Sequence, residues 1–211
     1  MGEPATIVGD NSSETINGTN GDDVIVARGG SDIVWGKRGN DLICGEGGND
    51  YLSAGSGEDR MNGNPGDDQL VGGSNTQLMD GGTGQDFFFS FGGSGGDIRG
   101  GRGGDWLVFT DRRCDEGVDV DLAARTAVYP ACTGWKNGSW QISSVRHVDG
   151  SDGRDVIAGS DDRNLLLGQE GRDVLSGRAG ADNLYGGPGR DIGEGGPGRD
   201  RCQTVETARS C

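Results

Sequence analysis

Nine consecutive nine-residue units, from Gly9 to Phe89, dominate the sequence and follow one another without an insertion. Almost every unit has an acidic residue at its sixth place, and every unit has an apolar residue at its eighth place. Examples are GTNGDDVIV (18–26), GKRGNDLIC (36–44), GEGGNDYLS (45–53) and GNPGDDQLV (63–71). A strict period of this kind indicates stacked repeats, because one unit cannot bury its apolar side chain alone and neighbouring units can.

The chemistry of one unit predicts its local structure. The last three residues, such as Val24, Ile25 and Val26, are typical of a short β-strand. Alternation along a strand sends the eighth residue inward and the seventh and ninth outward. Glycines at the first, second and fourth places allow the positive φ angles of tight turns. The units therefore predict short strands, joined by glycine-rich turns, around a thin apolar core.

A second array of six units occupies 150–203, again with a period of nine. Between the arrays, residues 109–149 are not repetitive, and the alternation of 117–127 predicts a strand followed by a turn. The predicted division of the chain is a first array with an N-terminal cap over 1–108, an irregular disulfide-bearing β lobe over 109–149, and a second array with a C-terminal disulfide cap over 150–211.

The units match the pattern GGxGxDxUx, in which U is apolar, and the chain resembles the repeats-in-toxin (RTX) family of calcium-binding β-rolls. The resemblance implies an all-β fold, a right-handed parallel β-roll or β-helix in which two units close one coil. Equivalent places would lie eighteen residues apart and about 4.8 Å apart along the roll. One edge would carry Asp23, Asp41 and Asp59, and the other Glu14, Asp32, Asp50, Asp68 and Asp86.

Sixth-place acids on adjacent coils, together with turn carbonyls, offer the roughly six to eight oxygen ligands that Ca²⁺ takes. Softer metals prefer other ligands. Gln77 replaces the acid in one unit, so the site that it would share with Asp59 is expected to be weak or empty. The predicted calcium ligands are Glu14, Asp23, Asp32, Asp41, Asp50, Asp59, Asp68, Asp86, Asp97, Asp105, Asp155, Asn164, Asp173, Asp182, Asp191 and Asp200.

The repeat pattern is broken at two places, and each break predicts a local change in structure or stability. Asp97 follows Asp86 by eleven residues, which puts Arg99 where an inward apolar residue belongs. We therefore expect the coil to bulge or unwind around 90–100. In the last two units Gly193 and Cys202 replace the apolar residue, so the final turns are expected to depend most on calcium.

The formal net charge is −15, from 34 acidic and 19 basic residues. This excess of negative charge excludes general binding to nucleic acids or to anionic membranes, since both are themselves negatively charged. Six carboxylate pairs in the first array and three in the second would bind nine divalent ions, whose charge of +18 brings the protein near neutrality. No apolar run approaches the length of about eighteen residues that spans a bilayer.

Five cysteines indicate an oxidising compartment and predict a secreted, extracellular protein. The local pairs Cys114–Cys132 and Cys202–Cys211 are predicted disulfides, each closing a short loop outside the regular turns. Cys44 is left over at an outward-facing ninth place. It is either an exposed thiol or a site of pairing between chains.

Enzyme chemistry has little support, because His147 is the single histidine and no HExxH motif is present. The favoured function is calcium binding, by a monomer, in a structural or adhesive role. Alternatives are the non-catalytic module of a secreted hydrolase, or a module that binds an acidic polysaccharide such as a cell-surface glycan. The polysaccharide would be bound by the fifth-place arginines of the second array; the alternative is that these arginines only offset the repulsion among the carboxylates. They are Arg154, Arg163, Arg172, Arg190 and Arg199.

Overall fold

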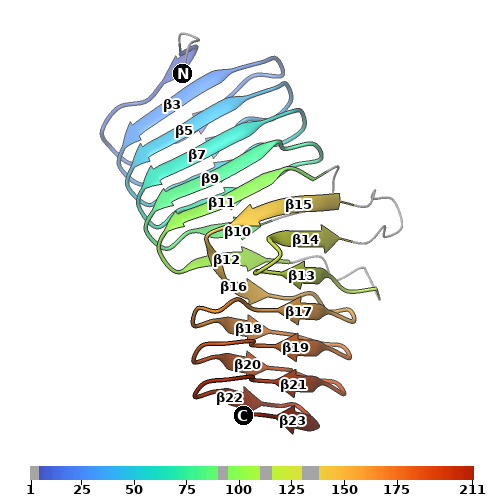
Figure 1. Ribbon diagram of the computed structural model, residues 1–211. Helices are drawn as coiled ribbons and strands as arrows, with labels where there is room; N and C mark the ends of the chain where they lie inside the picture. Colours follow the sequence, from blue (N-terminus) through green and yellow to red (C-terminus); the bar gives the residue numbers. More distant parts are fainter. Residues whose placement is uncertain (1–4, 90–94, 110–115, 130–137) are drawn as a thin grey trace. The chain divides into compact units, whose positions relative to one another are not determined.

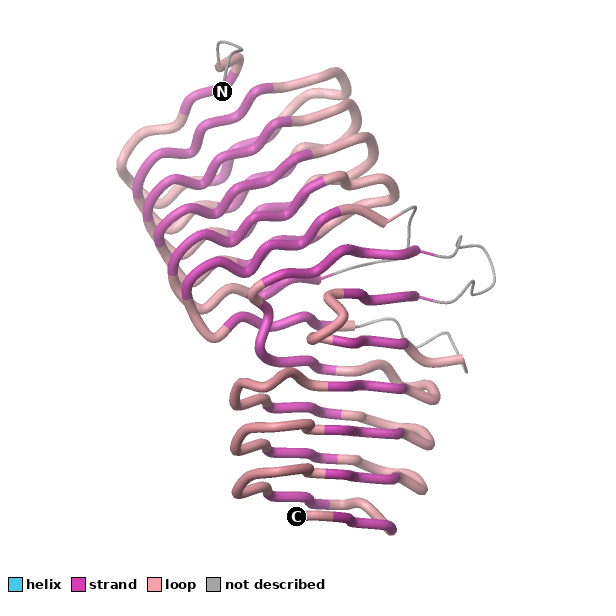
Figure 2. Tube along the Cα trace, in the orientation of Figure 1, coloured by secondary structure: helices cyan, strands magenta, loops and turns pink. Residues whose placement is uncertain are grey.

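The computed structural model describes residues 5–89, 95–109, 116–129 and 138–211 (Figure 1). The described part consists of strands and the loops between them (Figure 2), and it contains no helix that could span a membrane. Contacts divide the chain into two compact units, 1–105 and 106–211.

The first unit contains two parallel sheets whose strands alternate along the chain. Because strand pairs such as Val24↔Leu42 and Ile33↔Tyr51 are eighteen residues apart, two nine-residue units close one coil. One sheet consists of β1 (Ile7–Val8), β3 (Val24–Gly29), β5 (Leu42–Gly47), β7 (Arg60–Pro65), β9 (Leu78–Thr83) and β11 (Asp97–Arg102). The other consists of β2 (Thr15–Asn17), β4 (Ile33–Trp35), β6 (Tyr51–Ser53), β8 (Gln69–Val71) and β10 (Phe87–Phe89).

The second unit also has two sheets. One contains an antiparallel part, in which β14 (Thr126–Tyr129) pairs with β13 (Asp119–Asp121) and β15 (Gly138–Ser143). From β13 it continues in parallel through β17 (Val156–Ala158), β19 (Val174–Ser176), β21 (Ile192–Glu194) and β23 (Thr207–Arg209). The other sheet has the order β12 (Asp105–Val108), β16 (Val145–Asp149), β18 (Leu165–Leu167), β20 (Asn183–Tyr185) and β22 (Arg201–Gln203). The parallel β-roll predicted from the sequence is confirmed.

The eighth-place side chains form the core of the repeats, as predicted. They are at most 5% exposed and comprise Ile16, Ile25, Val34, Ile43, Leu52, Met61, Leu70, Met79 and Phe88 in the first array, and Ile157, Leu166, Leu175 and Leu184 in the second. In the non-repetitive part, Tyr129 and Trp140 are each 1% exposed, and the ring of Phe109 stacks on Tyr129 with centroids 6.0 Å apart. Large side chains thus replace the repeat core between the arrays.

The expectation for Arg99 is wrong. Ile98, which is fully buried, pairs with Met79 and occupies the inward place, whereas Arg99 pairs with Asp80 and is exposed. The pairing offset is nineteen residues here, so the chain accommodates the extra residue before β11 begins. Strand β11 remains parallel to β9, and residues 90–94 of the expected bulge lie outside the described part.

The cysteines are partly as predicted. Cys202 and Cys211 form the predicted disulfide, with Cα atoms 5.7 Å apart, whereas both members of the predicted Cys114–Cys132 pair lie outside the described residues. The exposure predicted for Cys44 is wrong, because it is only 1% exposed. The strand register places it between Val26 and Asn62 of the neighbouring strands.

The glycine-rich turns use positive φ at the second and fourth places. The second place is not always glycine: Glu46, for example, is exposed and has a φ of 68°. Replacing Glu46 with glycine is expected to raise the free energy of unfolding by about 1 kcal/mol, because left-handed backbone costs other residues about 1–2 kcal/mol and the entropy of glycine offsets part of the gain. Denaturant unfolding in saturating calcium measures the change. Glu46→Ala removes the same charge without relieving φ, so an equal gain in that variant would contradict the explanation.

Candidate metal centre

The sixth-place acids lie immediately before the strands, where the turn ends, and each carboxylate reaches back to the preceding coil. Its Oδ1 accepts a hydrogen bond from the backbone N–H of the acid eighteen or nineteen residues earlier, at 2.8–3.0 Å. These bonds connect the acids into four rows. Row A is Glu14, Asp32, Asp50, Asp68, Asp86 and Asp105, and row B is Asp23, Asp41 and Asp59. Row C is Asp155, Asp173 and Asp191, and row D is Asn164, Asp182 and Asp200.

The second carboxylate oxygen of most row members is buried without a hydrogen-bond partner among the described residues. A buried acceptor without a partner costs about 1–3 kcal/mol, and more if it is charged, so repetition of this feature requires an explanation. The residues whose Oδ2 is in this position are Asp32, Asp41, Asp50, Asp59, Asp68, Asp86, Asp173, Asp182, Asp191 and Asp200.

Where the unit begins with glycine, this oxygen points into a space that the glycine leaves open; the units of Asp32 and Asp59 begin instead with Ala27 and Ala54. A Cβ on Gly168 would overlap Asp173 Oδ2 and would lie 2.6 Å from the carbonyl oxygen of Gly186 on the following coil. Gly177 has the same surroundings, Asp182 Oδ2 at 2.5 Å and the carbonyl oxygen of Gly195 at 2.6 Å. Each carboxylate therefore binds the coil before it through Oδ1 and presents Oδ2 beside a carbonyl of the coil after it.

Such a space fits a hard cation, because its oxygens are a carboxylate without a partner and backbone carbonyls. No group of three or more His, Cys, Asp or Glu side chains comes together in the described ranges. The observed donor set is that of calcium and not that of zinc, which takes nitrogen and sulfur ligands.

Comparison with protein families identifies the repeat. A model of the RTX calcium-binding nonapeptide repeat, four copies long, matches residues 8–43, 45–76, 59–88, 149–184 and 167–202, which together make up more than half of the chain. The chain belongs to this RTX family. A search of curated proteins finds no match.

Burial raises the pKa of several acids of the RTX rows. It raises the pKa of Asp68 from 3.8 to about 7, and the carboxylates of Asp50 and Asp86 in the same row add to the shift. Burial and the neighbouring carboxylates of Asp155 and Asp191 likewise raise the pKa of Asp173 to about 7. Hydrogen bonds from backbone N–H groups oppose both shifts without cancelling them. In the metal-free protein Asp68 and Asp173 therefore retain protons close to neutral pH.

The row starts differ from the row interiors. Asp23, at the start of row B, accepts hydrogen bonds on Oδ2 from the backbone N–H and the hydroxyl of Thr19, at 2.6 and 3.0 Å. Asp155, at the start of row C, accepts the N–H of Ser151 on Oδ2 at 2.7 Å, and its Oδ1 accepts the hydroxyl of Ser151 and the N–H of Val118, both at 2.6 Å. In both rows a hydroxyl residue at the second place of the unit thus hydrogen-bonds to the first carboxylate.

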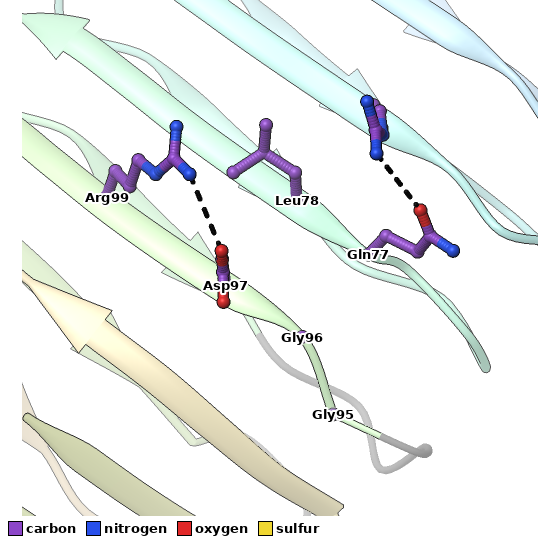
Figure 3. A pocket seen from close by; sticks show the side chains of 7 residues that line it. Gln77, Leu78, Gly95, Gly96, Asp97 and Arg99 are labelled. Atoms are coloured by element: carbon purple, nitrogen blue, oxygen red, sulfur yellow. Dashed lines mark hydrogen bonds and ion pairs between the residues drawn. The ribbon is translucent and has the colours of Figure 1, made fainter.

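Two sequence positions depart from the rows, and both border an open pocket of about 440 Å³ (Figure 3). The side chain of Gln77 points away from row B, accepting from Arg60 at 3.4 Å and donating to Glu58 at 3.0 Å. Asp97 lies at the seventh place, opposite Leu78, with its side chain 51% exposed and 3.5 Å from Arg99. The structure therefore does not bring Asp97 together with the other predicted ligands, and Asp105 is the residue that follows Asp86 in row A.

Sequence reasoning missed one acid. Glu206 lies outside the repeats, yet its Oε2 accepts a hydrogen bond from the backbone N–H of Asp191, as an acid on the next coil would. The signal that could have revealed it is an acid directly before the short β-forming segment Thr207–Arg209. His147, by contrast, accepts the backbone N–H of Leu165 on Nδ1 at 3.1 Å and contacts the ring of Trp106, so it has a structural role.

Proposed function

We propose that the chain is a secreted RTX β-roll that binds several calcium ions through rows A to D, requires them for folding, and serves as a structural or adhesive module. The observation that carries the proposal is the repeated buried Oδ2 without a hydrogen-bond partner, facing a carbonyl of the next coil. Secretion is supported by the Cys202–Cys211 disulfide, since disulfides persist in oxidising compartments.

A calcium titration followed by calorimetry tests the proposal. Asp50→Asn removes a carboxylate shared by two successive pairs of row A, and it is expected to reduce the number of bound ions by up to two. Asp97→Asn makes the same change outside the rows and is expected to leave the number unchanged. Magnesium should bind poorly, because it requires a tight octahedron and retains its water. Equal stoichiometry in wild type and Asp50→Asn would contradict the row assignment.

A second candidate function is recognition of an acidic polysaccharide by the fifth-place arginines. Arg154, Arg172 and Arg190 are exposed and eighteen residues apart, so their Cα atoms follow one edge in steps of about 4.8 Å. Among the described residues they have no ion pair. Their guanidinium groups are therefore available to anionic groups such as carboxylates.

Binding to a sulfated polysaccharide such as heparin, measured in calcium, tests this second function. The double variant Arg172→Ala/Arg190→Ala interrupts the ladder and is expected to weaken binding about tenfold. The control Arg163→Ala/Arg199→Ala removes the same charge from positions thirty-six residues apart, with Ala181 between them, and should weaken binding less. Equal losses in the two variants would indicate only a general effect of charge.

A further inference from the structure

The eight residues after the last repeat, Thr204–Cys211, form an additional, shortened coil. Strand β23 pairs with β21 in the register Ile192↔Thr207, an offset of fifteen residues instead of eighteen. Glu206, directly before β23, therefore occupies the place that a sixth-place acid has before its strand. Its side chain is one methylene longer than that of aspartate and accepts the N–H of Asp191 across this shorter turn.

The last member of row C faces the same kind of space as the members before it. Asp191 is only 1% exposed, and its Oδ2 has no hydrogen-bond partner among the described residues. A Cβ on Gly186 would lie 2.6 Å from this oxygen and would overlap the carbonyl oxygen of Thr204. In the coil before, the corresponding oxygens are Asp173 Oδ2 and the carbonyl of Gly186. Thr204 thus supplies the carbonyl that a repeat glycine supplies elsewhere.

Two further contacts hold the tail in this position. The Cys202–Cys211 disulfide joins β22 to the chain end across nine residues. A Cβ on Gly193 would lie 3.2 and 3.3 Å from the two methyl groups of Val205, so Val205 fills the space that the missing apolar side chain leaves open. The tail therefore supplies both an acid and an apolar side chain to the end of the roll.

We propose that Asp191, Glu206 and the carbonyl of Thr204 form a terminal calcium site, in which a non-repeat tail held by the disulfide replaces the following coil. The proposal rests on the proposed function of the rows and adds to it a ligand outside the nonapeptides. It implies that the end of the roll closes only when the disulfide is formed.

Glu206→Gln in the full chain tests the site. Glutamine can still accept the Asp191 N–H through its amide oxygen but has no charge, so the variant separates ligation from a purely structural cap. In a calcium titration it is expected to lose one bound ion or to weaken one site about tenfold or more. Hydrogen exchange should show that residues 186–206 lose protection at a higher free calcium concentration than in wild type. The matched control is Glu194→Gln, an exposed acid on β21, which should behave as wild type.

The outcomes separate the two proposals. If wild type binds no calcium, the function proposed for the rows fails. If wild type binds calcium and Glu206→Gln keeps both its stoichiometry and the protection of 186–206, only the terminal site fails. The double variant Cys202→Ser/Cys211→Ser is expected to reproduce the loss of one site while residues 18–71 remain protected. Retention of every site in that variant would overturn the dependence on the disulfide.

Discussion

Metal-free protein is expected to keep its fold only in acid, where protons replace the calcium that folding requires at neutral pH, and to lose stability as the pH rises from about 4 to about 7. Asp68 and Asp173 have a pKa of 3.8 when unperturbed and of about 7 in the fold, and Asp41, Asp86 and Asp155 have raised pKa values of about 6. The folded chain therefore binds protons more tightly than the unfolded chain does. Such groups contribute stability that is complete below the unfolded pKa and is lost as the pH rises through the folded pKa.

Calcium should reverse this dependence, because the carboxylates must release their protons before they can act as ligands. Circular dichroism melting curves of protein stripped on a chelating resin, with and without added calcium, measure both slopes between pH 5 and pH 7.5. The midpoint should fall with pH in the stripped protein and rise with pH at limiting calcium. If the melting midpoint changed with pH in the same way with and without calcium, the assignment of the row carboxylates as calcium ligands would be contradicted.

A single variant isolates the origin of the effect. Asp68→Asn places a neutral group in row A, and it should stabilise metal-free protein at pH 6 by about 1–3 kcal/mol while weakening calcium binding. The control Asp161→Asn makes the same chemical change at an exposed acid outside the rows and should produce neither opposing change. If Asp68→Asn destabilised the stripped protein, burial of charge would not be the cause of its instability.

The second large effect is expected at a fourth-place glycine. Gly48 has a φ of 130°, and a Cβ there would overlap the carbonyl oxygen of Gly30 on the preceding coil. Both groups are backbone, so neither can move without changing the distance between coils. Gly48→Ala is expected to lower the free energy of unfolding by about 3 kcal/mol or more, through backbone strain and overpacking together.

The neighbouring glycine provides the control. A Cβ on Gly47 would have no atom within 4 Å, and Gly47 is not among the residues with positive φ. Gly47→Ala should therefore leave stability within about 0.5 kcal/mol of wild type. Denaturant unfolding of both variants in saturating calcium makes the comparison, and a similar cost in the two would exclude the close approach of coils as the reason for glycine.

The sequence made the repeated part of the fold predictable, because each inward apolar residue and each acid recurs at a fixed place. Ile25, Ile43 and the acids before their strands could be placed for this reason. The nine-residue period gives wrong positions where an insertion interrupts it. Treating Asp97 as a sixth-place acid puts Arg99 at the eighth place, whereas pairing with β9 puts Asp97 at the seventh place and Arg99 at the ninth.

Other features depend on neighbours that the local pattern does not contain. The outward place of Cys44 predicts exposure, yet its side chain is only 1% exposed, because strand alternation alone does not determine what lies over an outward side chain. Glu206 could not be found by counting, because its coil is three residues short. The first glycine was expected to serve a turn, whereas the contacts of Gly168 and Gly177 show that it leaves space beside a carboxylate.

The hydrogen bonds between row members all run in one sense, from the N–H of an earlier coil to the carboxylate of the next. The roll is therefore a one-dimensional lattice with a head and a tail, and its two ends are not equivalent. Deleting a coil at the head leaves a carboxylate without its donor, and water can replace that donor. Deleting one at the tail deprives the preceding coil of both the acceptor for its N–H and the carbonyl facing its Oδ2. Because synthesis proceeds from the N-terminus, each coil therefore obtains all its contacts only after the following coil has been synthesised.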